Sequence, residues 1–275
     1  MTALGVASRR AVHQLFDHPK VLDDPIAIPI LGSEFFADPV RHADPRARAF
    51  RAWMVARSRY TEDSLASAVA SGVNQVNQYV LLGAGLDTFA YRNPFPHLRV
   101  FEVDFPSTQE LKRSRLRDAE IAEPANLTFV PIDFEHQTLA AALAEAGFDG
   151  AQATFFGWLG VIPYLTLPAF RSTLDFIASM PAGSGVAFDY SVADEELSPT
   201  MQRARKSLAQ RVAAAGEPFQ LFFRTEQMEN ELRSAGFQRI EQLDSLDINV
   251  RYFRNRADGL GLPEEGLGKL ASAWV

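Results

Sequence analysis

Two apolar runs joined by a glycine turn constrain the fold of this chain more than any other feature. Residues 79–82 and 100–103 are short and rich in branched side chains, as is typical of buried strands. The first run leads into a Gly-Ala-Gly turn with Gly83 and Gly85, and the second ends in Asp104, 19 residues after Gly85. This order predicts the first half of a nucleotide-binding βαβ unit. In such a unit the glycines let the backbone approach the ligand, and the acid accepts hydrogen bonds from the ribose hydroxyls.

The residues after the glycine turn distinguish two adenosine cofactors. A dinucleotide fingerprint has a third small residue three positions after the second glycine, whereas this chain has Thr88 there, preceded by Asp87. The carboxylate of Asp87 would repel the pyrophosphate of NAD but would attract a cationic amino group. S-adenosylmethionine (SAM) has an α-amino group and no phosphate, so the turn favours SAM over NAD. A tight turn that binds neither cofactor is the alternative.

Further apolar runs predict an α/β, doubly wound fold. We expect a mostly parallel, seven-stranded sheet with an antiparallel last strand at its edge and a helix after each early strand, including one directly after the glycine turn. The later predicted strands are residues 127–131, 152–156, 185–190, 237–243 and 248–253, the last two forming a hairpin.

The chain is predicted to form a single domain over residues 1–275. Residues 1–75 form a helical N-terminal cap, residues 76–193 and 217–275 form the α/β core, and residues 194–216 form a helical insertion. Because ligands of doubly wound folds bind at the carboxyl edge of the sheet, we expect the cap and the insertion to cover that edge.

Composition and charge exclude several classes of function. The net charge of −7 disfavours a nucleic-acid groove or an anionic membrane surface, and no run approaches the roughly 18 apolar residues of a membrane span. The absence of cysteine and the scatter of the five histidines disfavour a metal site. The first residues lack the pattern of a signal peptide, so we expect a cytoplasmic protein. The sequence does not indicate an oligomeric state.

Two segments, LLGAGLDTFAYR and VFEVDFP, resemble the leucine carboxyl methyltransferase-like family, a branch of the class I SAM-dependent O-methyltransferases. The phrases ALGVASRRA, LDDPIA, VARSRYTED and LRSAGF also match its pattern, so the resemblance spans nearly the whole chain. It implies a Rossmann-like fold, SAM as the methyl donor, S-adenosylhomocysteine (SAH) as the product and no metal. The family's bacterial members serve polyketide and other small-molecule pathways, which implies a small-molecule acceptor.

The resemblance also assigns cofactor contacts to six residues: Arg57, Gly83, Gly85, Asp104, Asp133 and Phe134. It implies that Arg57 binds the SAM carboxylate, with Arg59 as the near alternative, because a guanidinium matches a carboxylate with two hydrogen bonds. The glycines would lie beneath the methionine and ribose, Asp104 would bind the ribose, and Asp133 and Phe134 would contact adenine.

One position departs from the family's pattern. The family usually has W-E-G-V-x-x-Y-L after the fourth strand, whereas Leu159 replaces the glutamate here. The change indicates weaker SAM binding or an altered acceptor pocket, and it leaves Asp87 as the favoured partner of the SAM amino group.

The acceptor chemistry is less constrained. Methyl transfer mainly requires alignment of the acceptor oxygen; a carboxylate needs no base, whereas a hydroxyl would benefit from one. Tyr164 and Tyr190, near the carboxyl ends of strands, are the candidate catalytic residues, with packing as the alternative. The 21 phenylalanines favour a hydrophobic acceptor. The leading prediction is a SAM-dependent O-methyltransferase acting on a carboxylate or hydroxyl of a small molecule. The alternatives are a SAM- or SAH-binding protein without catalysis, a protein carboxyl methyltransferase and, disfavoured, an NAD oxidoreductase.

Overall fold

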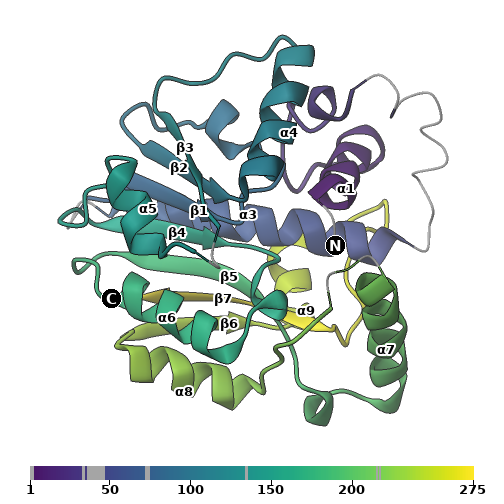
Figure 1. The fold of residues 1–275 in the computed structure, drawn as a ribbon. Coiled ribbons are helices and arrows are strands. Elements are labelled where there is room, and N and C mark those ends of the chain that lie inside the picture. Colours follow the sequence, from purple (N-terminus) through teal and green to yellow (C-terminus); the bar gives the residue numbers. More distant parts are fainter. Residues whose placement is uncertain are drawn as a thin grey trace.

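The computed structural model describes residues 3–32, 35, 47–71, 75–133, 136–214, 216 and 218–275. In this part of the chain, seven strands form one sheet in the order β3-β2-β1-β4-β5-β7-β6 (Figure 1). The strands are β1 (Gln78–Leu82), β2 (Arg99–Asp104), β3 (Leu127–Pro131), β4 (Thr154–Trp158), β5 (Gly185–Ser191), β6 (Arg239–Leu243) and β7 (Gly268–Trp274). Strands β1 to β5 run parallel, and β7 is antiparallel to both β5 and β6. The predicted mostly parallel sheet with an antiparallel last strand is confirmed.

Helices cover both faces of the sheet. Every residue of β1 and β4 is buried, which explains why these strands are continuous apolar runs rather than alternating ones. One face packs against α5 (Leu139–Glu145), α6 (Leu167–Ala178) and α8 (Thr225–Ala235). The other packs against α3 (Arg48–Ala70), α9 (Ser245–Ile248) and the adjoining π-helical turn η7 (Asn249–Phe253).

The helical N-terminal segment forms a third packed cluster. Helix α1 (Ala3–Phe16) and the 3-10 turn η1 (Pro29–Leu31) pack with α4 (Pro106–Asp118). Helix α7 (Pro199–Ala214), with the 3-10 turn η6 (Asp194–Glu196) before it, follows β5. Figure 1 shows α1 and α7 at the right, whereas the C-terminus lies at the left. Because β7 ends at the amino end of β5, the right side is the carboxyl edge of the parallel strands.

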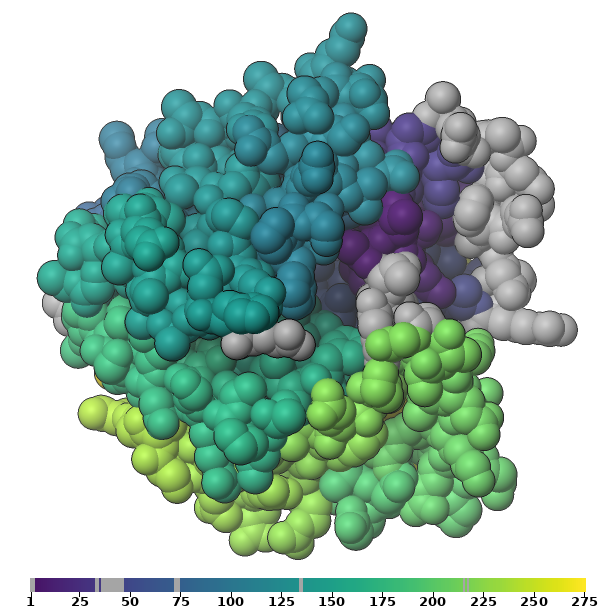
Figure 2. Space-filling model, in the orientation of Figure 1, coloured from purple at the N-terminus to yellow at the C-terminus, as the bar shows by residue number. Residues whose placement is uncertain are grey.

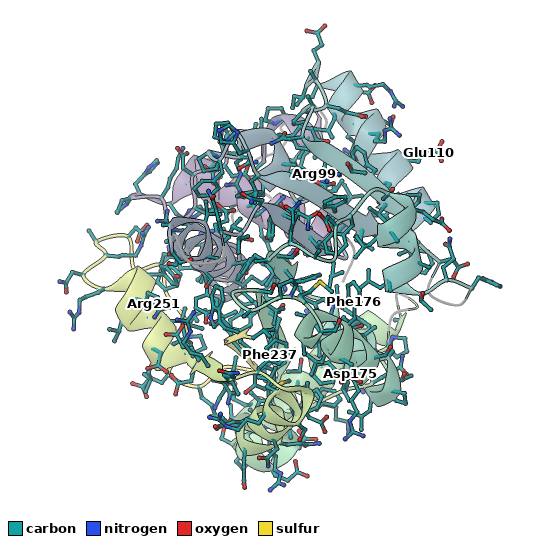
Figure 3. The ribbon with its side chains drawn as sticks, turned by 90° about the vertical axis from the view of Figure 1, so that its left-hand side faces the viewer. Arg99, Glu110, Asp175, Phe176, Phe237 and Arg251 are labelled. Atoms are coloured by element: carbon teal, nitrogen blue, oxygen red, sulfur yellow. The ribbon has the colours of Figure 1, made fainter. Side chains whose placement is uncertain are left out.

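The opposite edge is turned to the viewer in Figure 3, where Arg99, the first residue of β2, and Phe176 of α6 are labelled. The ring of Phe176 packs 6.1 Å from that of Phe156 and 6.4 Å from that of Phe148, measured between centroids. Phe176 therefore serves packing, at the edge of the sheet opposite the glycine turn.

The structure corrects the prediction of a C-terminal hairpin. Residues 248–253 were predicted to form a strand, but they complete α9 and form η7. The carboxylate of Asp244 accepts hydrogen bonds from the backbone N–H groups of Leu246 and Asp247, and Asp247 accepts one from that of Asp244. This capping box starts a helix where the sequence suggested a turn. The last strand is β7, which lies between β5 and β6, so the antiparallel strand is not at the edge.

The helix expected after the glycine turn is also absent. Between β1 and β2, where every residue is described, the chain forms only the 3-10 turn η4 (Phe89–Arg92). Pro94 and Pro96 follow directly, and proline cannot continue a helix because it lacks the backbone donor. Among the described helices, none combines the length and low polarity needed to cross a bilayer.

Candidate functional site

The glycine turn after β1 is held between two distant segments. Gly83 and Gly85 have φ angles of +68° and +52°, a region that favours glycine. The N–H of Gly83 donates to the carbonyl of Val103 at 2.9 Å, which ties the turn to β2. A Cβ on Gly83 would lie 2.4 Å from the side chain of Val161, and one on Gly85 would lie 3.3 Å from that of Ala3. The turn is thus packed between the residues after β4 and the start of α1.

The acid at the end of β2 contacts this turn. Asp104 accepts a hydrogen bond from the N–H of Gly85 at 2.6 Å and another from Phe105 at 2.7 Å. Burial raises the pKa of Asp104, and the two backbone hydrogen bonds partly oppose that rise. The structure therefore brings together the glycine and the acid that the sequence pairs, at the carboxyl edge where doubly wound folds bind ligands.

Asp87 is engaged by the N-terminal helix. One of its carboxylate oxygens accepts from the N–H of Phe89 at 2.8 Å, and the other lies 3.1 Å from Nη1 of Arg10. Burial by itself would raise the pKa of Asp87, but the positive charges of Arg10, Arg92 and Lys112 outweigh it and lower the pKa. Arg10 also donates to the carbonyl of Leu86. The carboxylate expected to meet the SAM amino group is therefore ionised and faces an arginine.

A buried carboxylate extends this contact into a network that the sequence patterns do not predict. Asp24 is fully buried and lies 3.5 Å from guanidinium nitrogens of both Arg10 and Arg92. It also accepts a hydrogen bond from the hydroxyl of Thr88 at 2.7 Å. Arg92 donates to Glu62 of α3 at 2.7 Å. The family-like phrases SRRA and LDDPIA supply Arg10 and Asp24, so these motifs fix the residues after the glycine turn.

The second group of predicted residues centres on Arg57 of α3. Its Nη1 donates to Asp189 of β5 at 2.9 Å, and the other oxygen of Asp189 accepts from the N–H of Gly160 at 2.5 Å. A Cβ on Gly160 would lie 2.9 Å from Nη1 of Arg57, so the glycine permits this close approach. Leu159 is half-buried beside it. Asp189 was not a predicted site residue, although an acid inside the apolar run 185–190 was a signal that could have found it.

The two groups are adjacent. Val161, one residue after Gly160, packs against Gly83. The strand order reverses between β1 and β4, and the Arg57–Asp189 pair lies on one side of this point while Asp104 lies on the other. Three features of this arrangement fit SAM. The Arg57 guanidinium can bind its carboxylate, the Asp104 carboxylate can bind its ribose hydroxyls, and the glycine turn lets the backbone approach the cofactor. In Figure 2 the surface is hollowed on this face, between the teal part above and the light green segment below, with the purple N-terminal residues in its wall. The residues described here contain no group of three potential metal ligands.

Of the remaining candidates, Asp133 is next to Ile132, whose N–H donates to the carbonyl of Asp104 at 3.0 Å, so Asp133 lies near this centre. Asp133 follows β3 and its carboxylate lies 3.0 Å from Nδ1 of His136, whereas Phe134 is outside the described residues. Tyr190 is 1 % exposed and donates to Gln242 at 2.5 Å, and burial raises its pKa. Its position fits the packing alternative.

Tyr164, in the 3-10 turn η5 (Ile162–Tyr164), is half-buried, with its ring 5.3 Å from that of Phe219. Of the two catalytic candidates, Tyr164 is therefore the one at the surface of the carboxyl edge.

Comparisons with known proteins agree with this geometry. The sequence model of the family described as leucine carboxyl methyltransferase matches residues 3–178. YktD of Bacillus subtilis, which carries the name of a SAM-dependent methyltransferase, is 34 % identical over 289 residues, 94 % of this chain and 93 % of YktD. A similarly named protein of Mycolicibacterium smegmatis is 37 % identical over 210 residues, 71 % of this chain and 67 % of its own length.

Two solved structures share the fold. A DUF574 family protein from Streptomyces avermitilis aligns with a TM-score of 0.59 at 16 % identity, covering 98 % of this chain and 96 % of that one. A Thermobifida fusca protein named as a methyltransferase aligns with a TM-score of 0.56 at 15 % identity, covering 98 % and 93 %.

Proposed function

Because this chain belongs to the leucine carboxyl methyltransferase family, we propose that it transfers the methyl group of SAM to an oxygen of a small molecule. That it is a SAM-dependent methyltransferase follows from the family and from full-length relatives. The oxygen as acceptor atom and the small molecule as substrate are the proposal.

The observation that carries the proposal is the contact between Asp104 and Gly85, opposite the buried Arg57–Asp189 pair. The site can hold two parts of SAM: Asp104 would bind the ribose hydroxyls and Arg57 would bind the carboxylate. The sulfonium methyl would lie between these two parts, near Gly83 and Val161.

The burial of Tyr190, the catalytic candidate on β5, supports an acidic acceptor. Tyr190 is in the core, and burial raises its pKa, so it is a poor proton acceptor. A carboxylate is already ionised at neutral pH and needs only to be aligned with the methyl group. We therefore place a carboxylate first and an acidic hydroxyl second as the acceptor, and the description of the family supports the same order.

The test is calorimetric titration of the purified protein with SAM, SAH and NAD. We expect SAM and SAH to bind with micromolar affinity and NAD not to bind. Asp104→Asn should weaken SAM binding at least about tenfold, since it removes the charged acceptor of the ribose hydrogen bonds. Asp118→Asn, at the exposed end of α4, is the matched control and should bind as the wild type does. Unchanged SAM affinity in Asp104→Asn would show that the cofactor geometry is wrong.

Leu159 supports a second candidate, a SAM- or SAH-binding protein without catalysis. This protein would bind the cofactor but would form no SAH from SAM with any acceptor. Leu159→Glu restores the residue usual in the family, so a variant that gains turnover over the wild type would favour this candidate. Turnover by the wild type itself would exclude it.

A further inference from the structure

A row of half-buried aromatic rings lies beyond the carboxyl ends of β4 and β5. The ring of Tyr164 lies 5.3 Å from that of Phe219, and Phe219 lies 6.3 Å from Phe222 at an angle of 88°. The guanidinium of Arg205 lies 4.7 Å from the centre of the Phe222 ring. All three rings are half-buried, whereas neighbouring Phe223 is fully buried in the core. A half-buried aromatic side chain leaves part of its ring exposed, and that part is able to contact another ring.

This row begins beside the cofactor site. Val161 contacts Gly83 of the glycine turn, and Tyr164 follows three residues later at the end of η5. The backbone of Gln220 donates to the carbonyl of Pro163 at 2.7 Å, which fixes the segment carrying Phe219 and Phe222 to η5. The first ring of the row is thus one short helical turn from the residue packed on the glycine turn.

A cavity continues the row at its other end. It has a volume of about 300 Å³ and is lined by Phe222, by Arg205 of α7, by Ala193 after β5 and by Arg224. This volume suits a small organic molecule. Because Phe222 belongs to both the row and the cavity, the row continues into the cavity. The cavity is also lined by Asp194, which pairs with Arg205, and by Glu195, so it ends among charged groups of both signs.

We propose that the row and the cavity form the acceptor site and that the acceptor contains a planar aromatic ring system, bound against Tyr164, Phe219 and Phe222. The proposal rests on the function proposed above and names the class of substrate. Aromatic rings prefer edge-to-face or offset contacts, and the 88° arrangement of Phe219 and Phe222 offers both a face and an edge. Each such contact is worth about threefold to tenfold in affinity. An aliphatic acceptor of the same volume would gain the burial but not these ring contacts.

The test compares an aromatic acid with its saturated analogue. In the presence of SAH, calorimetry would measure the binding of 2-naphthoate and of decahydronaphthalene-2-carboxylate to the wild type. We expect 2-naphthoate to bind about threefold to tenfold more tightly. Phe219→Leu and Phe222→Leu should remove this preference, because leucine keeps an apolar side chain without a ring. Phe176→Leu, at the opposite edge of the sheet, is the matched control and should keep it (Figure 3).

Titration with SAH separates this inference from the proposed function. The aromatic site is wrong, while the cofactor assignment stands, if all proteins bind SAH and one of three results follows: the wild type shows no aromatic preference, the Phe219→Leu and Phe222→Leu variants keep it, or 2-naphthoate does not bind. If SAH does not bind, the proposed function fails first. A parallel reaction with SAM and either 2-naphthoate or 2-naphthol, analysed by mass spectrometry, identifies a methyl ester or a methyl ether and so distinguishes the acid from the phenol.

Discussion

Arg10 couples the N-terminal helix to the cofactor site, and Arg10→Met tests that coupling. The side chain is 2 % exposed, faces Asp87 at 3.1 Å and Asp24 at 3.5 Å, and donates to the carbonyl of Leu86. Methionine fills much of the same volume without a charge. The variant therefore leaves two buried or partly buried carboxylates short of one positive partner.

The expected cost follows from these contacts. Removing one partner of a buried ion pair costs about 3–5 kcal/mol. Because Arg92 still lies 3.5 Å from Asp24, we expect the lower end, a loss of about 3 kcal/mol in the free energy of unfolding. For a domain of this size that corresponds to a fall of roughly 6–12 °C in melting temperature. SAM affinity should fall by about tenfold, since the residues after the glycine turn are no longer preorganised.

Urea unfolding and SAM calorimetry measure the two effects, with Arg9→Met as the matched control. Arg9 is the adjacent arginine of α1, and it donates to the carbonyl of Gly5 and lies 4.5 Å from the ring of Phe50 rather than facing the glycine turn. The control should lose about 1 kcal/mol or less and keep its SAM affinity.

A double variant, Arg10→Met with Asp87→Asn, tests the cause. Removing the unpaired carboxylate should recover part of the stability lost in Arg10→Met, because contacting residues show coupling energies of about 0.5–3 kcal/mol. The reasoning is refuted if Arg10→Met unfolds within about 1 kcal/mol of the wild type and binds SAM equally well.

Three further changes test other parts of the structure. Burial raises the pKa of Glu102 to about 7 despite its pairing with Lys112, so the folded protein keeps a proton that the unfolded chain loses near its ordinary pKa of 4.5. The stabilising effect of this proton is complete below pH 4.5 and is lost as the pH rises through about 7. In the double variant Glu102→Gln, Lys112→Met, the free energy of unfolding measured with urea should depend less steeply on pH across this range. An equally steep dependence contradicts the assignment. Arg57→Lys keeps a charge but loses the planar fork, so SAM binding measured by calorimetry should weaken by about tenfold, and equal affinity would place the SAM carboxylate elsewhere. Gly157→Ala would place a Cβ 2.4 Å from the hydroxyl oxygen of buried Tyr79, so thermal unfolding should report a loss of about 1–3 kcal/mol, and an unchanged melting temperature would mean that the tyrosine can move.

Local sequence patterns predicted the elements that depend on local physics. The buried strands β1, β2 and β4 are short apolar runs, and the turn after β1 requires the positive φ angles that Gly83 and Gly85 adopt. The strand β7 was missed because Ala271, Ser272 and Ala273 have low strand propensity. Pairing with β5 on one side and β6 on the other determines its conformation. A pattern of neighbouring residues in the sequence does not contain these long-range strand pairings.

In the candidate site too, local patterns predicted some residues, whereas long-range contacts determine the others. Asp104 was predicted because its distance from the glycine turn along the chain is itself a pattern. The Arg10–Asp24–Arg92 contacts join residues that are separated by up to 82 positions and have no shared periodicity, so only the folded chain reveals them. The capping box of α9 is a different case, since Asp244 and Asp247 are a local signal that was available in the sequence.

The substitution at position 159 changes the charge at the end of the site that would hold the methionine part of SAM. Arg57 is already paired with Asp189, and the N–H of Gly160 binds the second oxygen of that carboxylate. A glutamate at 159, beside this pair, would add a second carboxylate and make the local charge negative, which favours the cationic amino group of SAM. With Leu159 the pair is close to neutral, and Asp87 on the other side of the turn is neutralised by Arg10. The amino group of SAM would therefore have to share Asp189 with Arg57. The cofactor affinity of this chain then depends on how strongly the Asp189 carboxylate can bind both cations at once.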